Sequence, residues 1–92
     1  MEEVSETRSQ TELNRLRWRS RRGMAELDVL FVPFFEEAFD ALSADMKEVY
    51  ARMLDEEDPE LWSWFSEQSA PNDPHYRSLV SLMLSRVRPN DS

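Results

Sequence analysis

The chain has 92 residues, of which 19 are acidic and 11 basic, and a net charge of −8 at pH 7. A domain of this length buries only roughly 60 to 65% of the surface of its unfolded chain, which leaves no room for a deep catalytic cavity and suits a single small binding domain. The absence of cysteine and the presence of one histidine exclude disulfides and metal sites built on cysteine or paired histidine.

The two ends of the chain are predicted to lie outside the folded domain. Residues 1–10 are polar and lack hydrophobic periodicity, which is typical of a disordered acidic leader, and residues 89–92 are expected to form a flexible tail. The glutamates of the leader make it too acidic for a signal or transit peptide. We therefore expect an unprocessed, soluble cytoplasmic protein with one domain, residues 11–88.

The first helix is predicted from about Thr11 to Arg21. Its core side is formed by Leu13, Leu16 and Met24. Its exposed face is predicted to be basic and aromatic, with Arg15, Trp18, Arg19 and Arg22. Residues 1–22 hold six arginines against four glutamates, whereas residues 23–92 hold five basic against fifteen acidic side chains. This separation of charge orients the encounter with a partner of matching polarity.

The second helix is predicted from about Met24 to Ala41 and forms the centre of the core. Its apolar stripe follows the helical period and consists of Leu27, Leu30, Phe31, Phe34, Phe35, Ala38 and Leu42. Pro33 lies inside this helix and cannot donate a hydrogen bond to the carbonyl of Val29. A kink or a short break is therefore expected at this point.

Three further helices complete the predicted fold. Ser43 is a good cap for a helix over residues 44–55, with an apolar stripe of Met46, Val49, Tyr50, Met53 and Leu54. Two Asp-Pro pairs predict capped starts of the last two helices, Asp58-Pro59 and Asp73-Pro74. Their core residues are predicted to be Leu61, Trp62, Trp64 and Phe65, then Tyr76, Leu79, Val80, Leu82, Met83 and Val87. No segment alternates with period two, so the prediction is all-α: a compact five-helix bundle in one small domain.

Acidic clusters and the single histidine are the candidates for catalytic or metal chemistry. Glu36-Glu37 and residues 55–58 are acidic, but a di-metal site in a bundle needs Glu-x-x-His pairs, and the residue three before His75 is Asn72. A solvated acidic face explains these clusters better. His75 has no cysteine nucleophile or recognisable serine motif to serve. The chain is therefore predicted to be no enzyme and to hold no metal.

Nucleic acid is a more serious alternative, because the arginines around Trp18 have the chemistry to contact phosphates while the indole stacks on a base. The overall acidity and the lack of a recognised nucleic-acid-binding motif argue against it. One glycine cannot form a phosphate-cradling loop, so no cofactor of the chain's own is expected. No apolar run reaches the length of a membrane span, so membrane insertion is not expected.

Gly23 is the only glycine of the chain and lies within an R-G-x-x-E motif, Arg22-Gly23-Met24-Ala25-Glu26. A glycine used once is expected at a tight corner or where another backbone comes close. In the first case Gly23 ends the first helix in a left-handed cap, and Arg22 forms a surface ion pair with Glu26 worth only about 0.3 to 0.5 kcal/mol. In the second case Gly23 leaves room for a partner. The residues alone do not decide between the two.

The motif lies in a longer pattern, Arg21-Arg22-Gly23 followed by Glu26-Leu27-Asp28, and three further segments follow it in the chain. They are Pro33-Phe34-Phe35, the Leu42-Ser43 corner, and Asp58-Pro59-Glu60-Leu61-Trp62-Ser63-Trp64. In this order the segments resemble the SdhE family, the flavin assembly factors of succinate dehydrogenase, over about residues 13–88. Five letters are a weak motif, but the ordered set is specific.

The resemblance implies a function in assembly rather than catalysis. Members of the SdhE family bind the flavoprotein subunit of succinate dehydrogenase, and often that of fumarate reductase, and promote covalent attachment of FAD to it. The attachment chemistry belongs to the flavoprotein and its flavin. The matching residues imply a client interface centred on Arg21, Arg22, Gly23 and Glu26, with Trp18, Met24 and Asp28 beside them. In this interface Arg22 meets client carboxylates or carbonyls, and Glu26 orients Arg22 or accepts from client donors.

Two positions depart from the family pattern, and both concern helix ends. Met46 stands where many members have an acidic residue that completes a capping box with Ser43, and Ser69 stands where many have a glycine. An alternative function from another class also remains: a generic interaction module, such as an antitoxin-like regulator, that uses the same arginine-rich face on an unrelated partner.

Overall fold

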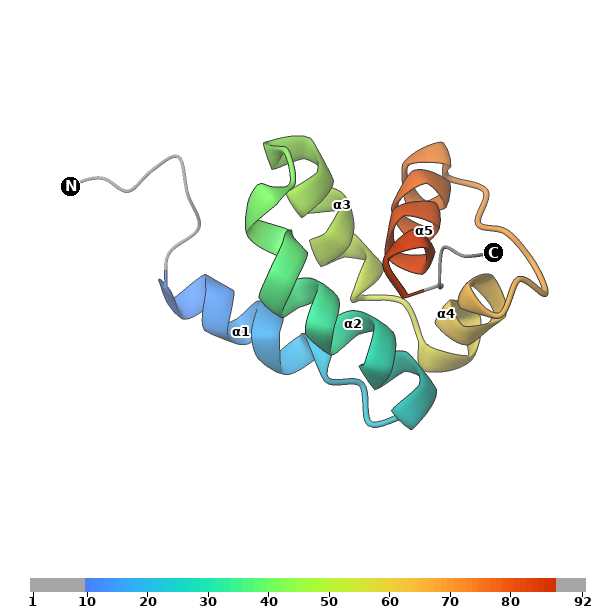
Figure 1. Ribbon diagram of the computed structural model, residues 1–92, viewed down its shortest axis with the longest axis horizontal. Coiled ribbons are helices and arrows are strands. Elements are labelled where there is room, and N and C mark those ends of the chain that lie inside the picture. The colour runs from blue at the N-terminus through green and yellow to red at the C-terminus, as the bar shows by residue number, and fades with distance from the viewer. Residues whose placement is uncertain (1–9, 88–92) are drawn as a thin grey trace.

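The computed structural model describes residues 10–87 (Figure 1). The helices are α1 (Gln10–Ser20), α2 (Ala25–Ala38), the 3-10 helix η1 (Phe39–Ala41), α3 (Ala44–Met53), α4 (Asp58–Phe65) and α5 (Pro74–Val87). This part of the chain contains no strand, which confirms the predicted all-α bundle of five helices. Helix α1 begins at Gln10, the last residue of the predicted leader. The rest of the leader and the predicted tail lie outside the described residues.

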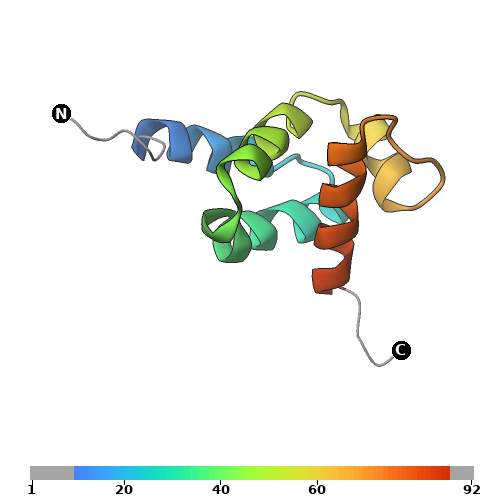
Figure 2. The same cartoon turned by 90° about the horizontal axis from the view of Figure 1, so that it is seen from above.

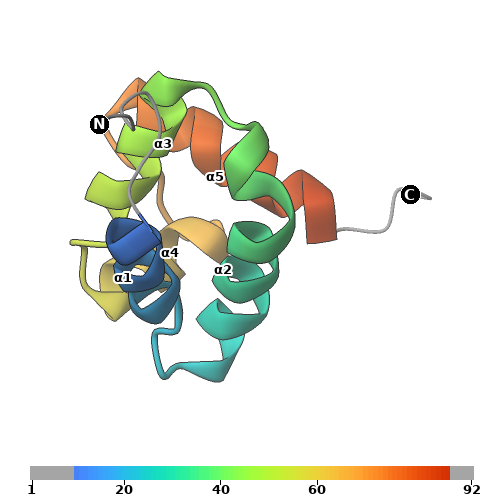
Figure 3. The ribbon, with the colours of Figure 1, turned by 90° about the vertical axis from the view of Figure 1, so that its left-hand side faces the viewer.

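Helix α2 is the centre of the bundle and packs against α1, α4 and α5, while α3 packs against α5. Figure 2 shows α5 crossing the direction of α1 and α2, so that it covers one end of the α2 layer. Figure 3 looks along α1 and shows α2 and α3 on different sides of it. The turn between α1 and α2 therefore lies at an edge of the bundle, where a partner can reach it.

The apolar stripe of α2 forms the core as predicted. Its buried residues are Leu27, Leu30, Phe31, Phe34 and Phe35. Burying each such side chain contributes about 1.5 to 3 kcal/mol. Pro33 causes no break, since α2 continues through it to Ala38, and the change to 3-10 geometry comes only at Phe39. Pro33 and Val29 both lie on the exposed side of the helix, where solvent can replace the missing hydrogen bond.

All three predicted helix starts are confirmed within one residue, but only two of the three predicted caps are present. The Ser43 hydroxyl accepts a hydrogen bond from the Met46 N–H at 3.1 Å, and the Asp73 carboxylate accepts from the His75 N–H at 2.8 Å. This backbone hydrogen bond is the main cause that lowers the pKa of Asp73. The cap predicted at Asp58 is wrong. Helix α4 begins at Asp58 itself, the flanking residue Glu57 makes no side-chain cap, and the Asp58 carboxylate accepts from Arg22 Nε instead.

The last helix buries less of its predicted apolar stripe than expected. Tyr76, Leu79, Val80 and Met83 are buried, but Leu82 and Val87 are exposed, so their assignment to the core is wrong. Residue 87 lies in the last turn of α5, where no other helix covers it. Helix α3 also ends at Met53, two residues before the predicted end.

A buried polar contact joins α1 to α3, and the hydrophobic pattern gave no sign of it. Ser20 is 1% exposed; its hydroxyl donates to the Leu16 carbonyl at 2.8 Å and lies 2.6 Å from the Tyr50 hydroxyl. Because the Ser20 hydroxyl proton is already donated to the Leu16 carbonyl, the Tyr50 hydroxyl is the donor to Ser20. The ring of Tyr50 lies among four phenylalanines, with centroid distances from 5.5 to 6.1 Å. This contact fixes the end of α1, and with it the start of the turn that follows.

Between neutral and alkaline pH, the Tyr50→Phe variant is expected to lose less stability than wild type. Burial raises the pKa of the Tyr50 phenol above its ordinary value of 10.0. Above about pH 10 the unfolded state therefore loses this proton first, and the free energy of unfolding falls as the pH rises. Urea denaturation at pH 8 and pH 11 measures the effect: wild type should lose more stability between the two than Tyr50→Phe. At pH 8 the variant should be about 1 kcal/mol less stable, because Ser20 loses its donor.

Candidate functional site

The R-G-x-x-E motif forms the turn between α1 and α2. Just after the end of α1, the Arg21 N–H donates a hydrogen bond to the Trp18 carbonyl at 3.1 Å. Gly23 then takes φ +90°, a conformation that side chains other than glycine rarely adopt. A Cβ at Gly23 would meet nothing within 4 Å. Backbone conformation is therefore the reason for glycine within the chain itself, and the open space around it is available to a partner.

The turn is held from the side of α2 by Asp28. Its carboxylate oxygen accepts hydrogen bonds from the N–H of Arg22 at 2.6 Å and from that of Gly23 at 3.3 Å. Asp28 also lies in the first turn of α2, where the helix dipole favours a negative charge. Met24 lies just before α2 and packs partly against the core. These contacts fix the backbone of the motif on the bundle.

Arg22 points into the molecule, so its predicted place on the exposed face is wrong. Its side chain is 14% exposed and its Nε donates to the Asp58 carboxylate at 2.9 Å. The two other guanidinium nitrogens donate to backbone carbonyls of Leu54 at 2.9 Å, Glu56 at 2.8 Å and Arg19 at 3.3 Å. Arg22 thus ties the motif to the loop between α3 and α4. A planar guanidinium is suited to several acceptors at once.

The predicted ion pair between Arg22 and Glu26 is absent. The Arg22 donors already serve Asp58 and the loop carbonyls, and the exposed Glu26 side chain makes no hydrogen bond or ion pair to any residue in 10–87. The sequence placed Asp58 as a helix cap, and no local pattern pairs it with an arginine 36 positions earlier.

The arginines of α1 and Arg21, which follows it, divide into paired and unpaired side chains. Arg17 forms an ion pair with Glu36, and Arg19 with Asp55. The contact with Glu36 raises the pKa of Arg17. Arg15 and Arg21 are exposed and have no such partner within the described part of the chain. Beside them, Trp18 is 73% exposed, as the sequence predicted. The exposed members of the site are therefore Trp18, Arg21, Gly23 and Glu26.

A hollow of about 320 Å³ lies in the groove between α1 and α2, next to the turn. Arg17, Trp18 and Arg21 line it from α1 and its C-terminal end, and Val32 and Glu36 line it from α2. It joins two of the predicted interface residues, Trp18 and Arg21, to α2 residues that the sequence did not single out. The sequence did contain a sign of Val32, because this apolar residue lies off the core stripe of α2.

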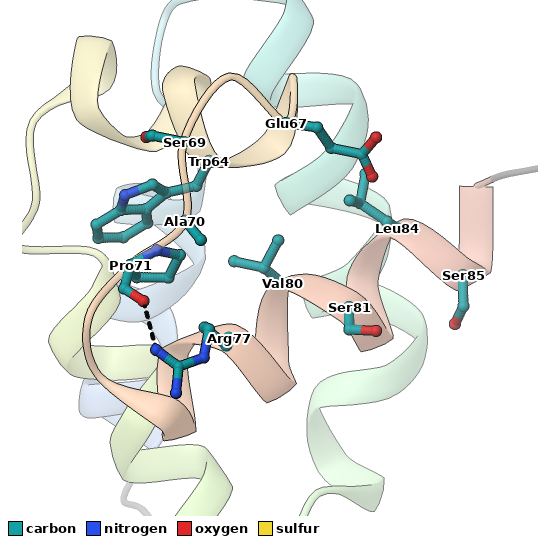
Figure 4. A pocket seen from close by; sticks show the side chains of 10 residues that line it. All are labelled: Trp64, Glu67, Ser69, Ala70, Pro71, Arg77, Val80, Ser81, Leu84 and Ser85. Atoms are coloured by element: carbon teal, nitrogen blue, oxygen red, sulfur yellow. Dashed lines mark hydrogen bonds between the residues drawn. The ribbon is translucent and has the colours of Figure 1, made fainter.

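A second hollow lies between α5 and the loop that precedes it (Figure 4). Its volume is about 460 Å³, and Trp64, Val80 and Leu84 form its apolar part. Arg77 stands at its edge and donates to the carbonyls of Pro71 and Asn72, both at 2.9 Å. This hollow contains none of the motif residues. Over residues 10–87 there is also no cluster of histidine or acidic side chains that could hold a metal, and no helix long and apolar enough to span a membrane.

Comparison with known proteins connects this arrangement to a family. Residues 14–87 match the family model described as "Flavinator of succinate dehydrogenase". The chain belongs to this family. It is 49% identical to the FAD assembly factor SdhE of Pseudomonas putida over 80 residues, which cover 87% of this chain and 95% of that protein. It is 43% identical to that of Pseudomonas aeruginosa, covering 88% and 96%, and 46% identical to that of Idiomarina loihiensis, covering 80% and 82%.

Proposed function

We propose that this protein is an assembly factor that binds the flavoprotein subunit of succinate dehydrogenase and promotes covalent attachment of FAD to it. The observation that carries the proposal is the family match over residues 14–87, which spans the motif turn and every helix that supports it. In this proposal the protein is cytoplasmic, and the flavoprotein of fumarate reductase is its second client. It has no cofactor of its own and does not bind nucleic acid.

The proposed division of labour within the motif follows from exposure. Arg22 and Asp28 position the turn, since their polar atoms are bound within the chain. Arg21 and Glu26 meet the client, because both are exposed and have no partner of their own within residues 10–87. The open space at Gly23 lets a client backbone approach. A turn fixed before binding loses little conformational entropy in the complex.

The factor contributes binding rather than covalent chemistry in this proposal. A rigid face that holds the domains of the client in a reactive arrangement lowers the entropic part of the barrier to attachment. The bond itself forms between the flavin and the client. In this proposal the chain needs neither a deep cavity nor a catalytic group of its own.

In-gel flavin fluorescence tests the proposal. The succinate dehydrogenase flavoprotein is expressed in cells that lack their own factor, with wild type, with Arg21→Ala, or with neither, and is then denatured and separated. Wild type should restore a covalent flavin signal, and Arg21→Ala should restore little of it with an unchanged melting temperature. Equal signals in all three, with soluble folded protein, would refute the proposed function and favour an unrelated partner for the same face.

A further inference from the structure

Helix α2 carries an apolar stripe on its outer face as well as in the core. Ala25, Val29 and Val32 follow one another at i, i+4 and i+7, so they lie on one side of the helix. Ala25 is exposed, Val29 is 63% exposed and Val32 is half-buried. The outer face of a helix in a small soluble domain is normally polar. This stripe is therefore unexplained by the fold.

The stripe meets α1 at the hollow already described, which we call the α1–α2 trough: Arg17, Trp18, Arg21, Val32 and Glu36. Trp18 and Val32 form its apolar walls. The ion pair between Arg17 and Glu36 neutralises the charge at one end. Arg21 lies four residues after Arg17, just past the end of α1, and its side chain has no partner within residues 10–87. The trough thus combines apolar walls, a neutralised ion pair and, at Arg21, a cation that is unpaired among residues 10–87.

We propose that the α1–α2 trough receives a segment of the client flavoprotein in which a large apolar side chain stands within a few residues of a carboxylate. The apolar side chain packs between Trp18 and Val32, and the carboxylate pairs with Arg21. This inference rests on the proposed function and names the chemistry of the client segment.

Charge complementarity selects an acidic segment over a basic one. The chain outside its first 22 residues holds fifteen acidic and five basic side chains, so most of its surface repels a carboxylate. Arg15 on α1 and Arg21 just after it are the cations of this region whose side chains remain unpaired among the described residues. An exposed tryptophan beside an unpaired arginine is also the composition of binding hot spots. A carboxylate that approaches the protein is therefore attracted to this end of the trough.

Binding of the purified flavoprotein subunit to variants of the trough tests the apolar part. Trp18→Ala and Val32→Glu should each weaken binding by on the order of 30-fold. Leu82→Glu is the control, since it places an acid at an apolar position outside the trough, on α5, where Leu82 is 40% exposed, and should bind within about twofold of wild type. Circular dichroism melting of each variant shows that the bundle is folded.

Zero-length cross-linking tests the carboxylate. The chain contains one lysine, Lys47, so Arg21→Lys adds a single new amine at the end of the trough. A carbodiimide joins this amine only to a carboxylate in direct contact with it. Mass spectrometry should find an adduct that wild type lacks, on a client Asp or Glu within about four residues of a large apolar side chain.

Two results would overturn the trough proposal. One is wild-type affinity in both Trp18→Ala and Val32→Glu; the other is an Arg21→Lys complex without the adduct, or with the adduct in a segment that has no large apolar residue. If wild type still promotes flavin attachment, the proposed function stands and only the trough is wrong. If wild type neither binds the flavoprotein nor promotes attachment, both proposals fail.

Discussion

Arg22→Ala is expected to destabilise the bundle by about 2 to 3 kcal/mol, because it leaves Asp58 and the carbonyls of the α3–α4 loop without their donor. For a domain of this size that corresponds to a fall in melting temperature of about 10 to 20 °C. Since Arg22 also fixes the turn, flavin attachment should fall even at temperatures where the variant is folded. Thermal melting followed by circular dichroism, beside the in-gel assay, measures both effects.

The neighbouring arginine is the matched control. Arg21→Ala removes an exposed side chain that has no hydrogen bond or ion pair within residues 10–87, so its melting temperature should stay within about 2 °C of wild type. Its flavin attachment should nevertheless be strongly reduced. An Arg22→Ala protein that melts like wild type, or an Arg21→Ala protein that melts like Arg22→Ala, would contradict this assignment of a positioning and a contacting arginine.

Substitutions of Gly23 are expected to separate backbone strain from contact with the client. Gly23→Ala and Gly23→Arg should lose the same stability, about 1 to 2 kcal/mol, since both must adopt φ +90° and a Cβ meets nothing within 4 Å. Gly23→Asn should lose less, because asparagine tolerates the left-handed region better. Denaturant unfolding of the three variants measures these differences.

Flavin attachment by the same variants should instead decrease as the side chain at position 23 becomes larger. Gly23→Arg should abolish the covalent flavin signal, because its side chain fills the space that the client needs. Gly23→Ala, with equal strain and little bulk, should retain a clear part of the signal. If Gly23→Ala and Gly23→Arg lost attachment equally, backbone conformation alone would account for the glycine, and close approach of the client at this position would be wrong.

Local sequence patterns were sufficient for the helices and most of the core. The apolar period of α2 predicted its buried face, and Ser43 and the Asp73-Pro74 pair predicted two helix starts. These features depend on neighbours within four residues, which the sequence displays directly. The same reasoning failed at Val87, because burial at the end of a helix depends on whether another element reaches it, and at Leu82, which lies off the buried face of α5.

The sequence by itself determined the all-α class and the core of α2, and it predicted an interface at the arginine-rich turn that contains Gly23. Only the tertiary structure showed which side chains of that turn are bound within the chain and which are exposed. Arg21 and Arg22 are identical in type and adjacent in the chain, yet Arg22 is bound by a loop 32 to 36 residues away and Arg21 is exposed. Packing of α1 against α2 and α3 sets that difference, and hydrogen bonds over such a separation leave no local pattern to predict them.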